Sequence, residues 1–137
     1  MPSNRYPHPL SGGLLYALQD GRLGEVFNRI HTVPDALWRV EKLASLANMS
    51  RSKFSGYFTQ IMGISPMGYV TAWRMKVAQD MLRDGVQIKV IAESVGYSSQ
   101  ASFSKSFLNV ISCPPAEWLK RDANAEVPLV TMHVYNE

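Results

Sequence analysis

The chain contains little cysteine or histidine. Cys113 is the one thiol among 137 residues, which excludes an internal disulfide framework and a cysteine-cluster zinc site. The three histidines, His8, His31 and His133, stand too far apart to show the spacing of metal ligands. We therefore expect neither a metal nor a cofactor, and a reducing, cytoplasmic location is the simplest expectation.

Long apolar runs are also missing. No stretch approaches the roughly 20 apolar residues that a membrane-spanning helix needs, and residues 1–13 hold three prolines instead of the apolar run of a signal peptide. Charged residues make up 18% of the chain and hydrophobic residues 46%, which argues against wholesale disorder. The composition predicts one compact domain, or two small ones that share an interface, with no membrane partner.

Negative charge is absent from two windows of the chain. No aspartate or glutamate occurs within residues 42–79 or within residues 94–116, although the net charge of the whole chain is only +3. A polyanion could approach either window without meeting a carboxylate from it. The alternative is that the windows arose by chance and are compensated elsewhere in the fold. The basic residues within them are Lys42, Arg51, Lys53, Arg74, Lys76 and Lys105.

The periodicity of the apolar residues predicts an all-α chain. Leu23, Phe27 and Ile30 recur at helical spacing, and Ser50 and Ser65 are typical residues at a helix start. Seven helices are expected, over residues 20–31, 40–46, 51–62, 65–83, 88–95, 99–110 and 114–121.

Both ends of the chain lie outside these helices. Residues 1–19 are predicted to be a flexible arm or the remnant of an interdomain linker, in which Leu14, Leu15 and Leu18 could begin a short helix. Residues 122–137 alternate weakly between apolar and polar positions, so this tail is expected to be a strand-like flap or disordered.

Two parts of the chain repeat each other. Phe54 and Phe103 lie 49 residues apart, and so do Phe58 and Phe107. The repeat predicts two helix-turn-helix subdomains of homeodomain-like type, over residues 20–64 and 85–121, joined by a long linker helix over residues 65–84. A duplicated helical hairpin can be pure scaffold, so the repeat alone does not name a function. We expect the aromatic core to contain these four phenylalanines together with Trp38, Trp73 and Trp118.

In a helix-turn-helix unit the second helix enters the major groove of DNA. If the phenylalanines anchor that helix inward, the residues left to face outward are small or polar, and none is acidic. Glutamine can pair with adenine and lysine with guanine or phosphate, while serine and threonine suit phosphate. The predicted DNA-binding residues are Arg51, Ser52, Lys53, Ser55, Gly56, Thr59 and Gln60 in the first copy, and Ser99, Gln100, Ala101, Ser104 and Lys105 in the second.

Three segments resemble the DNA-binding domain of the AraC/XylS family of transcription regulators. They are VEKLASLANMSRSKFSGYF at residues 40–58, GISPMGYVTAWRM at residues 63–75 and IAESVGYSSQASFSKSF at residues 91–107. The resemblance covers residues 20–121, which is 102 of the 137 residues. It implies a seven-helix domain that places two recognition helices in successive major grooves, with some bending of the DNA.

The resemblance also implies roles for particular residues. Base-reading positions fall at Ser52, Ser55 and Gly56 in the first helix, and at Gln100, Ala101 and Lys105 in the second. Arg74 matches a linker-helix arginine that the family uses to tie the two halves together. From the residues themselves, we expect Arg74 to donate a partly buried salt bridge and not to contact phosphate.

Some positions depart from the family pattern. Gly56 and Ala101 have no side chain that could hydrogen-bond a base, so the first helix would read by close approach, methyl contact or water, or would use Arg51 and Gln60. Ser112 stands where the family usually has glycine, and a left-handed helix end there would cost serine about 1 kcal/mol. Arg39 occupies a position where the family usually has a serine or threonine cap.

These observations favour sequence-specific binding of double-stranded DNA, as the output domain of an AraC-type regulator in a bacterial cytoplasm, associated with the nucleoid. RNA polymerase is the expected second partner. The domain itself is expected to be monomeric, with dimerisation through a further domain as an alternative. A helical protein-interaction module that kept the fold and lost DNA reading is the competing hypothesis. No set of side chains suggests an enzyme.

Overall fold

The computed structural model describes residues 20–124, and within that range the chain forms seven helices and no strand. This confirms the predicted all-α fold with two helix-turn-helix subdomains and a linker helix. The helices are α2 (Gly24–Thr32), α3 (Val40–Leu46), α4 (Arg51–Met62), α5 (Pro66–Arg83), α6 (Ile88–Ser94), α7 (Gln100–Ile111) and α8 (Pro115–Asn124). The predicted leucine helix at residues 14–18 and most of the predicted tail, residues 125–137, lie outside the described residues.

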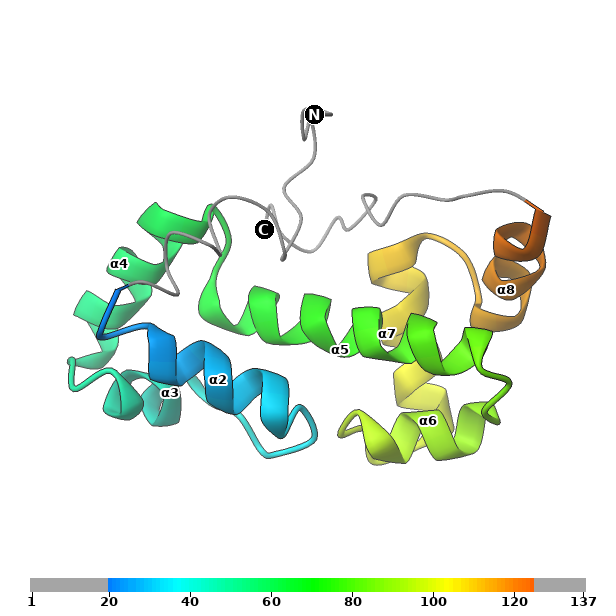
Figure 1. Cartoon of the computed structure of the whole chain (residues 1–137), viewed down its shortest axis with the longest axis horizontal. Coiled ribbons are helices and arrows are strands. Elements are labelled where there is room, and N and C mark those ends of the chain that lie inside the picture. Colours follow the sequence, from blue (N-terminus) through cyan, green and yellow to red (C-terminus); the bar gives the residue numbers. More distant parts are fainter. Residues whose placement is uncertain (1–19, 125–137) are drawn as a thin grey trace.

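The long helix α5 lies between two groups of shorter helices (Figure 1). Helices α2, α3 and α4 form the group at one end, and α6, α7 and α8 form the group at the other. Helix α5 packs against α3 and α4 on one side and against α6, α7 and α8 on the other. It can do so because residues along its whole length are buried, from Tyr69 near its start to Leu82 near its end.

Each subdomain has its own aromatic core. In the first, Phe27 packs edge-on against Tyr69 with ring centroids 5.1 Å apart, and Phe58 lies 5.4 Å from Phe27. In the second, Phe107 packs against Phe103 at 5.8 Å and against Trp118 at 6.1 Å. The four phenylalanines of the repeat are fully buried, as predicted.

Trp38 and Trp118 are buried as expected, but Trp73 is only half-buried. Its indole stacks on the imidazole of His31, with ring centroids 4.1 Å apart. The Nε2 atom of His31 is hydrogen-bonded to the hydroxyl of Tyr69. Burial lowers the pKa of His31, which favours the neutral ring in this packed position.

Two helix boundaries differ by more than one residue from those expected. The first helix begins at Gly24 and not at Asp20, because the Asp20 carboxylate accepts hydrogen bonds from the backbone N–H groups of Arg22 and Leu23 and forms a turn. The last helix continues to Asn124, beyond the expected end at Arg121. Asp122 therefore belongs to α8 and not to the tail.

The two recognition-type helices begin and end alike. Ser50 accepts a hydrogen bond from the backbone N–H of Lys53, and Ser99 accepts one from that of Ser102, so both serines act as N-caps. At the other ends, Gly63 has φ +79° and Ser112 has φ +77°. Serine thus ends α7 in a left-handed conformation, at a cost that glycine does not carry.

Exchanging the residues at these two helix ends should shift stability in opposite directions. We expect Ser112→Gly to raise the free energy of unfolding by about 0.5–1 kcal/mol, because relief of the left-handed conformation outweighs the greater flexibility of unfolded glycine. Gly63→Ser should lower it by a similar amount, since the space around Gly63 admits a side chain and only the backbone conformation opposes one. Urea unfolding of both variants measures this, and destabilisation by Ser112→Gly would contradict it.

The end of α5 is bound to α8 by a bidentate ion pair. Arg83 Nε donates to Asp122 Oδ2 at 2.8 Å, and Arg83 Nη2 donates to Asp122 Oδ1 at 3.0 Å. The guanidinium also lies over the ring of Trp118, 5.0 Å from its centroid. These hydrogen bonds lower the pKa of Asp122 and raise that of Arg83, because each stabilises the charged form.

This pair should make stability depend on pH in the acid range. Its contribution is present above about pH 4, the ordinary pKa of aspartate, and is lost as the pH falls through the lowered pKa of Asp122. Asp122→Asn should therefore lower the Tm at pH 7, and the Tm curves of the variant and the wild type should converge towards pH 2. Glu117→Gln, which removes an exposed ion pair with Arg121 on the same helix, is the matched control and should change little. Parallel Tm curves for Asp122→Asn and wild type would contradict the assignment.

None of the helices in residues 20–124 is long and apolar enough to cross a membrane.

Candidate nucleic-acid interface

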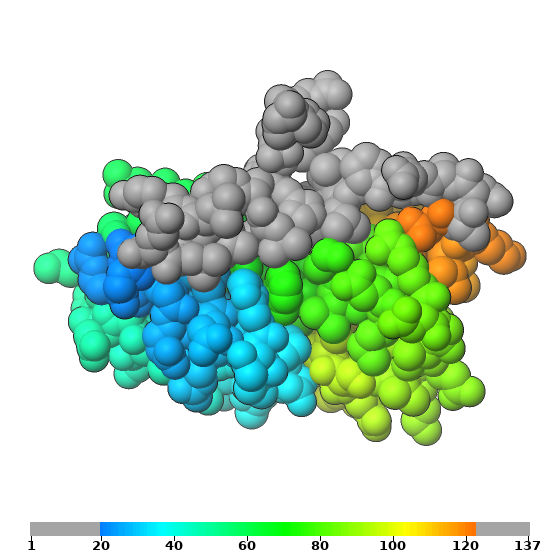
Figure 2. All heavy atoms as spheres, in the orientation of Figure 1, coloured from blue at the N-terminus to red at the C-terminus, as the bar shows by residue number. Residues whose placement is uncertain are grey.

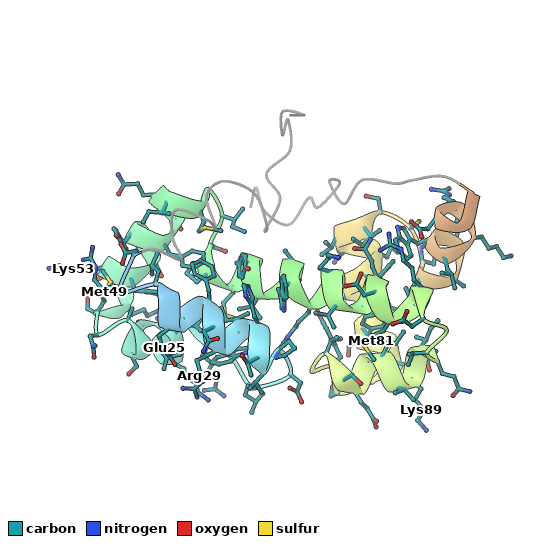
Figure 3. The ribbon with its side chains drawn as sticks, in the orientation of Figure 1. Glu25, Arg29, Met49, Lys53, Met81 and Lys89 are labelled. Atoms are coloured by element: carbon teal, nitrogen blue, oxygen red, sulfur yellow. The ribbon has the colours of Figure 1, made fainter. Side chains whose placement is uncertain are left out.

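Helix α4 presents one apolar face and one polar face. Phe54 and Phe58 are fully buried and fix which side of the helix turns inward. Six of the seven residues predicted on this helix are exposed and Ser55 is half-buried. Lys53 points away from the body of the molecule at its end (Figure 3). The exposed six are Arg51, Ser52, Lys53, Gly56, Thr59 and Gln60.

Helix α7 repeats this arrangement in the second subdomain. Phe103 and Phe107 are fully buried, while Gln100, Ala101 and Lys105 are exposed and Ser104 is half-buried. The remaining predicted residue, Ser99, precedes the helix. Its hydroxyl accepts a hydrogen bond from the backbone N–H of Ser102 at 3.0 Å and also donates to the Ser102 hydroxyl. Ser99 thus has a structural role as a cap in addition to any contact it makes with a ligand.

A carboxylate from outside the acid-free windows reaches the start of α4. Glu41 on α3 lies 3.4 Å from Arg51, and both side chains are mostly exposed. An exposed pair of this kind is weak, so the guanidinium can exchange the carboxylate for another anion at little cost. Helix α4 carries two basic residues, Arg51 and Lys53. Arg51 must release Glu41 before its Nη1 can bind a phosphate.

Hydrogen bonds connect the segment before α2 to α4. Tyr57 donates its hydroxyl hydrogen to Asp20, and Arg22 Nη2 donates to the Tyr57 hydroxyl at 2.9 Å. The guanidinium of Arg22 also lies over the Tyr57 ring, 4.5 Å from its centroid. The hydrogen bond lowers the pKa of Asp20 and raises that of Tyr57. Tyr57 therefore connects α4 to the segment before α2 through its contacts with Asp20 and Arg22.

The linker residue Arg74 has a different role from the expected salt bridge. Its Nε donates to the carbonyl oxygen of Pro34, and its Nη2 donates to that of Ala36, both at 2.8 Å. The same guanidinium lies over the ring of Tyr97 in the second subdomain, 5.7 Å from its centroid. The acceptors are backbone carbonyls and not a carboxylate, so the predicted salt bridge was wrong. Arg74 nevertheless contacts both halves, as the resemblance implied: Pro34 and Ala36 in one and Tyr97 in the other.

The structure adds one residue to the outward face of α7 that the sequence reasoning missed. Asn109 is exposed and lies four residues after Lys105, so the two occupy the same side of the helix. An asparagine amide can bind adenine through two hydrogen bonds. The i, i+4 spacing from Lys105 was the signal that could have identified it.

No group of three or more potential metal-ligating side chains occurs within residues 20–124. Cys113 is buried, and its burial raises the pKa of the thiol. The arrangement therefore offers two capped helices with small, polar and basic exposed faces.

Comparison with known proteins identifies the family. A family model described as a helix-turn-helix domain matches residues 43–121. A putative AraC-like transcription regulator of Streptomyces lividans is 36% identical over 117 residues, which are 85% of this chain and 38% of that protein. The chain belongs to the AraC/XylS family.

A second relative shows similar identity. The RCS-specific HTH-type transcriptional activator RclR of Escherichia coli K12 is 39% identical over 109 residues, which are 79% of this chain and 38% of RclR. The chain thus spans about two-fifths of the length of these curated relatives. The relatives are transcription regulators, a class that is not enzymatic.

Solved structures agree with the fold. The C-terminal domain of AraT, a response regulator from Geobacillus stearothermophilus, has a TM-score of 0.69 at 26% identity, covering 74% of this chain and 86% of that one. A DNA-binding transcriptional dual regulator from Escherichia coli K-12 has a TM-score of 0.66 at 28% identity, covering 80% and 98%. The DNA-binding domain of AdpA, solved in complex with a target DNA, shares the fold with a TM-score of 0.69 at 24% identity, covering 75% and 94%.

Proposed function

We propose that the chain binds double-stranded DNA sequence-specifically, as the output domain of an AraC-type transcription regulator. Helices α4 and α7 would each enter a major groove, in two successive turns of the duplex. The observation that supports this most strongly is the pairing of two exposed helix faces without acidic residues, one in each copy of the repeat, on a single linker helix. Membership of a family of helix-turn-helix regulators points the same way.

On each helix, some residues would contact base edges and others would contact phosphates. Gln100 and Lys105 on α7 carry groups that can read adenine and guanine, and Asn109 extends that face by one turn. On α4, the base-reading work falls to Arg51 and Gln60, because Gly56 offers only close approach. The other residues in the predicted set have small side chains that contact phosphate or allow the helix to sit deep in the groove. These are Ser52, Ser55, Thr59, Ser99, Ala101 and Ser104, with Lys53 as a further phosphate contact.

The partners follow from this function. The first is promoter or operator DNA, which bends where the fixed pair of helices does not match a straight duplex. The second is RNA polymerase, as expected of a regulator; RclR, among the relatives, is described as an activator. The domain would act as a monomer, with dimerisation left to a further domain where the whole protein has one.

A salt titration separates DNA binding from the competing function, a protein-interaction module with the same fold. We expect the affinity for both random and selected duplexes to fall steeply as salt rises, because each phosphate contact releases a counterion. The selected site should be preferred by a factor of roughly a thousand. Fluorescence anisotropy with labelled duplexes measures both quantities. Binding that does not respond to salt would contradict the proposal.

Substitutions on α7 test the assignment of individual residues. Gln100→Ala and Lys105→Ala should each weaken binding to the selected site by about 1–3 kcal/mol and relax the base preference at one position. Lys89→Ala is the matched control, since it removes the same charge from α6, outside the two proposed recognition helices (Figure 3). If the α7 variants weaken random and selected DNA equally, these residues position the protein and do not read bases.

A further inference from the structure

The turns of the two helix-turn-helix units are equivalent in the repeat but differ in the residue that adopts the left-handed conformation. Asn48 ends the turn segment after α3, and Gly96 lies 48 residues later in the turn after α6. Both have a positive φ, +57° at Asn48 and +94° at Gly96. The left-handed conformation alone does not demand glycine, because the first copy achieves it with asparagine.

The surroundings of Gly96 explain the difference. A methyl group placed on Gly96 would lie 2.9 Å from Nη2 of Arg74 and 3.0 Å from the Cα of Asp35. Asp35 belongs to the loop between α2 and α3, so this is a contact between the two subdomains. Figure 2 shows the atoms of that loop, in cyan, against the yellow-green atoms of the second subdomain at the lower edge of the molecule. Asn48, by contrast, is exposed.

Neither Asp35 nor Arg74 can move away from a side chain at residue 96 without breaking other contacts. Asp35 contributes a backbone atom, flanked by two carbonyl groups that accept hydrogen bonds from Arg74, those of Pro34 and Ala36. The Arg74 atom nearest to Gly96, Nη2, is the donor to Ala36. A side chain on Gly96 would therefore have to break that hydrogen bond or push the second subdomain away from the loop.

We propose that Gly96 is a positioning residue that sets the spacing between the two DNA half-sites the protein accepts. Its missing side chain lets the α6–α7 turn close onto Arg74 and the α2–α3 loop, which fixes the orientation of α7 relative to α4. Helix α7 begins at Gln100, four residues after Gly96, so a displaced turn displaces the recognition helix. The proposal rests on the proposed DNA-binding function.

Spacing is the property that this contact would control. Each base pair inserted between two half-sites rotates one relative to the other by roughly a tenth of a turn. Two recognition helices held rigidly can follow such a change only by deforming the DNA, which costs affinity. Helices held loosely would accept several spacings with similar affinity, and would bind the best one less tightly because their orientation is not fixed in advance.

The test compares alanine at the two equivalent turns. Gly96→Ala and Asn48→Ala both place alanine in a left-handed conformation, but only the methyl group at residue 96 meets the other subdomain. Each protein is titrated with duplexes that carry the selected operator and with duplexes that have one base pair added or removed between its half-sites. Thermal unfolding followed by circular dichroism verifies folding, and Gly96→Asn replaces Gly96→Ala if the latter does not fold, because asparagine tolerates this conformation.

We expect the wild type and Asn48→Ala to bind the altered spacings about tenfold more weakly than the selected one. Gly96→Ala should bind the selected spacing about tenfold more weakly than the wild type and should distinguish the three spacings by less than about threefold. Its base preference within each half-site should be unchanged, because α4 and α7 keep their own residues. A Gly96→Ala protein that keeps the tenfold spacing preference would overturn the proposal.

A measurement without DNA separates this inference from the proposed function. Spin labels at the exposed residues Gln60 on α4 and Leu108 on α7, in a Cys113→Ala background, report the distance between the two helices. The distance distribution should be narrow in the wild type and in Asn48→Ala, and broader in Gly96→Ala. Identical distributions would refute the positioning role. Absence of specific DNA binding by the wild type would instead refute the proposed function, whatever the labels report.

Discussion

The arrangement of the two subdomains depends on the guanidinium of Arg74. Apolar packing along α5 holds the two halves together, but burial of apolar surface has no direction of its own. The planar guanidinium supplies direction, because its donors must meet the carbonyl oxygens of Pro34 and Ala36 in one geometry while its face lies over Tyr97. Leaving those carbonyls without a partner in a half-buried loop would be costly, so the contact resists change. Arg74 thus links the α2–α3 loop to the α6–α7 turn.

The duplicated units solve the same local problem with the same chemistry and differ where they meet. Serine caps both recognition-type helices, at Ser50 and Ser99, and both helices end in a left-handed residue. The turn residues Asn48 and Gly96 also share a left-handed backbone. Only one of the two turns packs against the other copy, and that turn has the residue without a side chain. The duplication thus gives two equivalent helix-turn-helix units, and the residue without a side chain lets one turn pack against the other unit.

Much of the fold was predictable from the sequence, because helices are local structures. The seven helices, the serine caps at Ser50 and Ser65 and the buried phenylalanines were predicted correctly. One error is local, at Asp20, and the others lie where side chains far apart in the chain determine the outcome. The end of α8 was misplaced near Asp122, whose carboxylate binds Arg83, 39 residues away. Trp73 was assigned to the core, but it is half-buried at the surface against His31.

The outward faces of α4 and α7 were also predicted, since the buried phenylalanines at i and i+4 leave only one side of each helix to face solvent. The sequence by itself therefore determined which helices form and which residues of α4 and α7 face outward. Only the tertiary structure decided what Arg74 binds and why Gly96 lacks a side chain. Arg74 binds carbonyl oxygens 38 and 40 positions away in the chain, and Gly96 lies against a residue of the other subdomain. No helical period places such distant residues together.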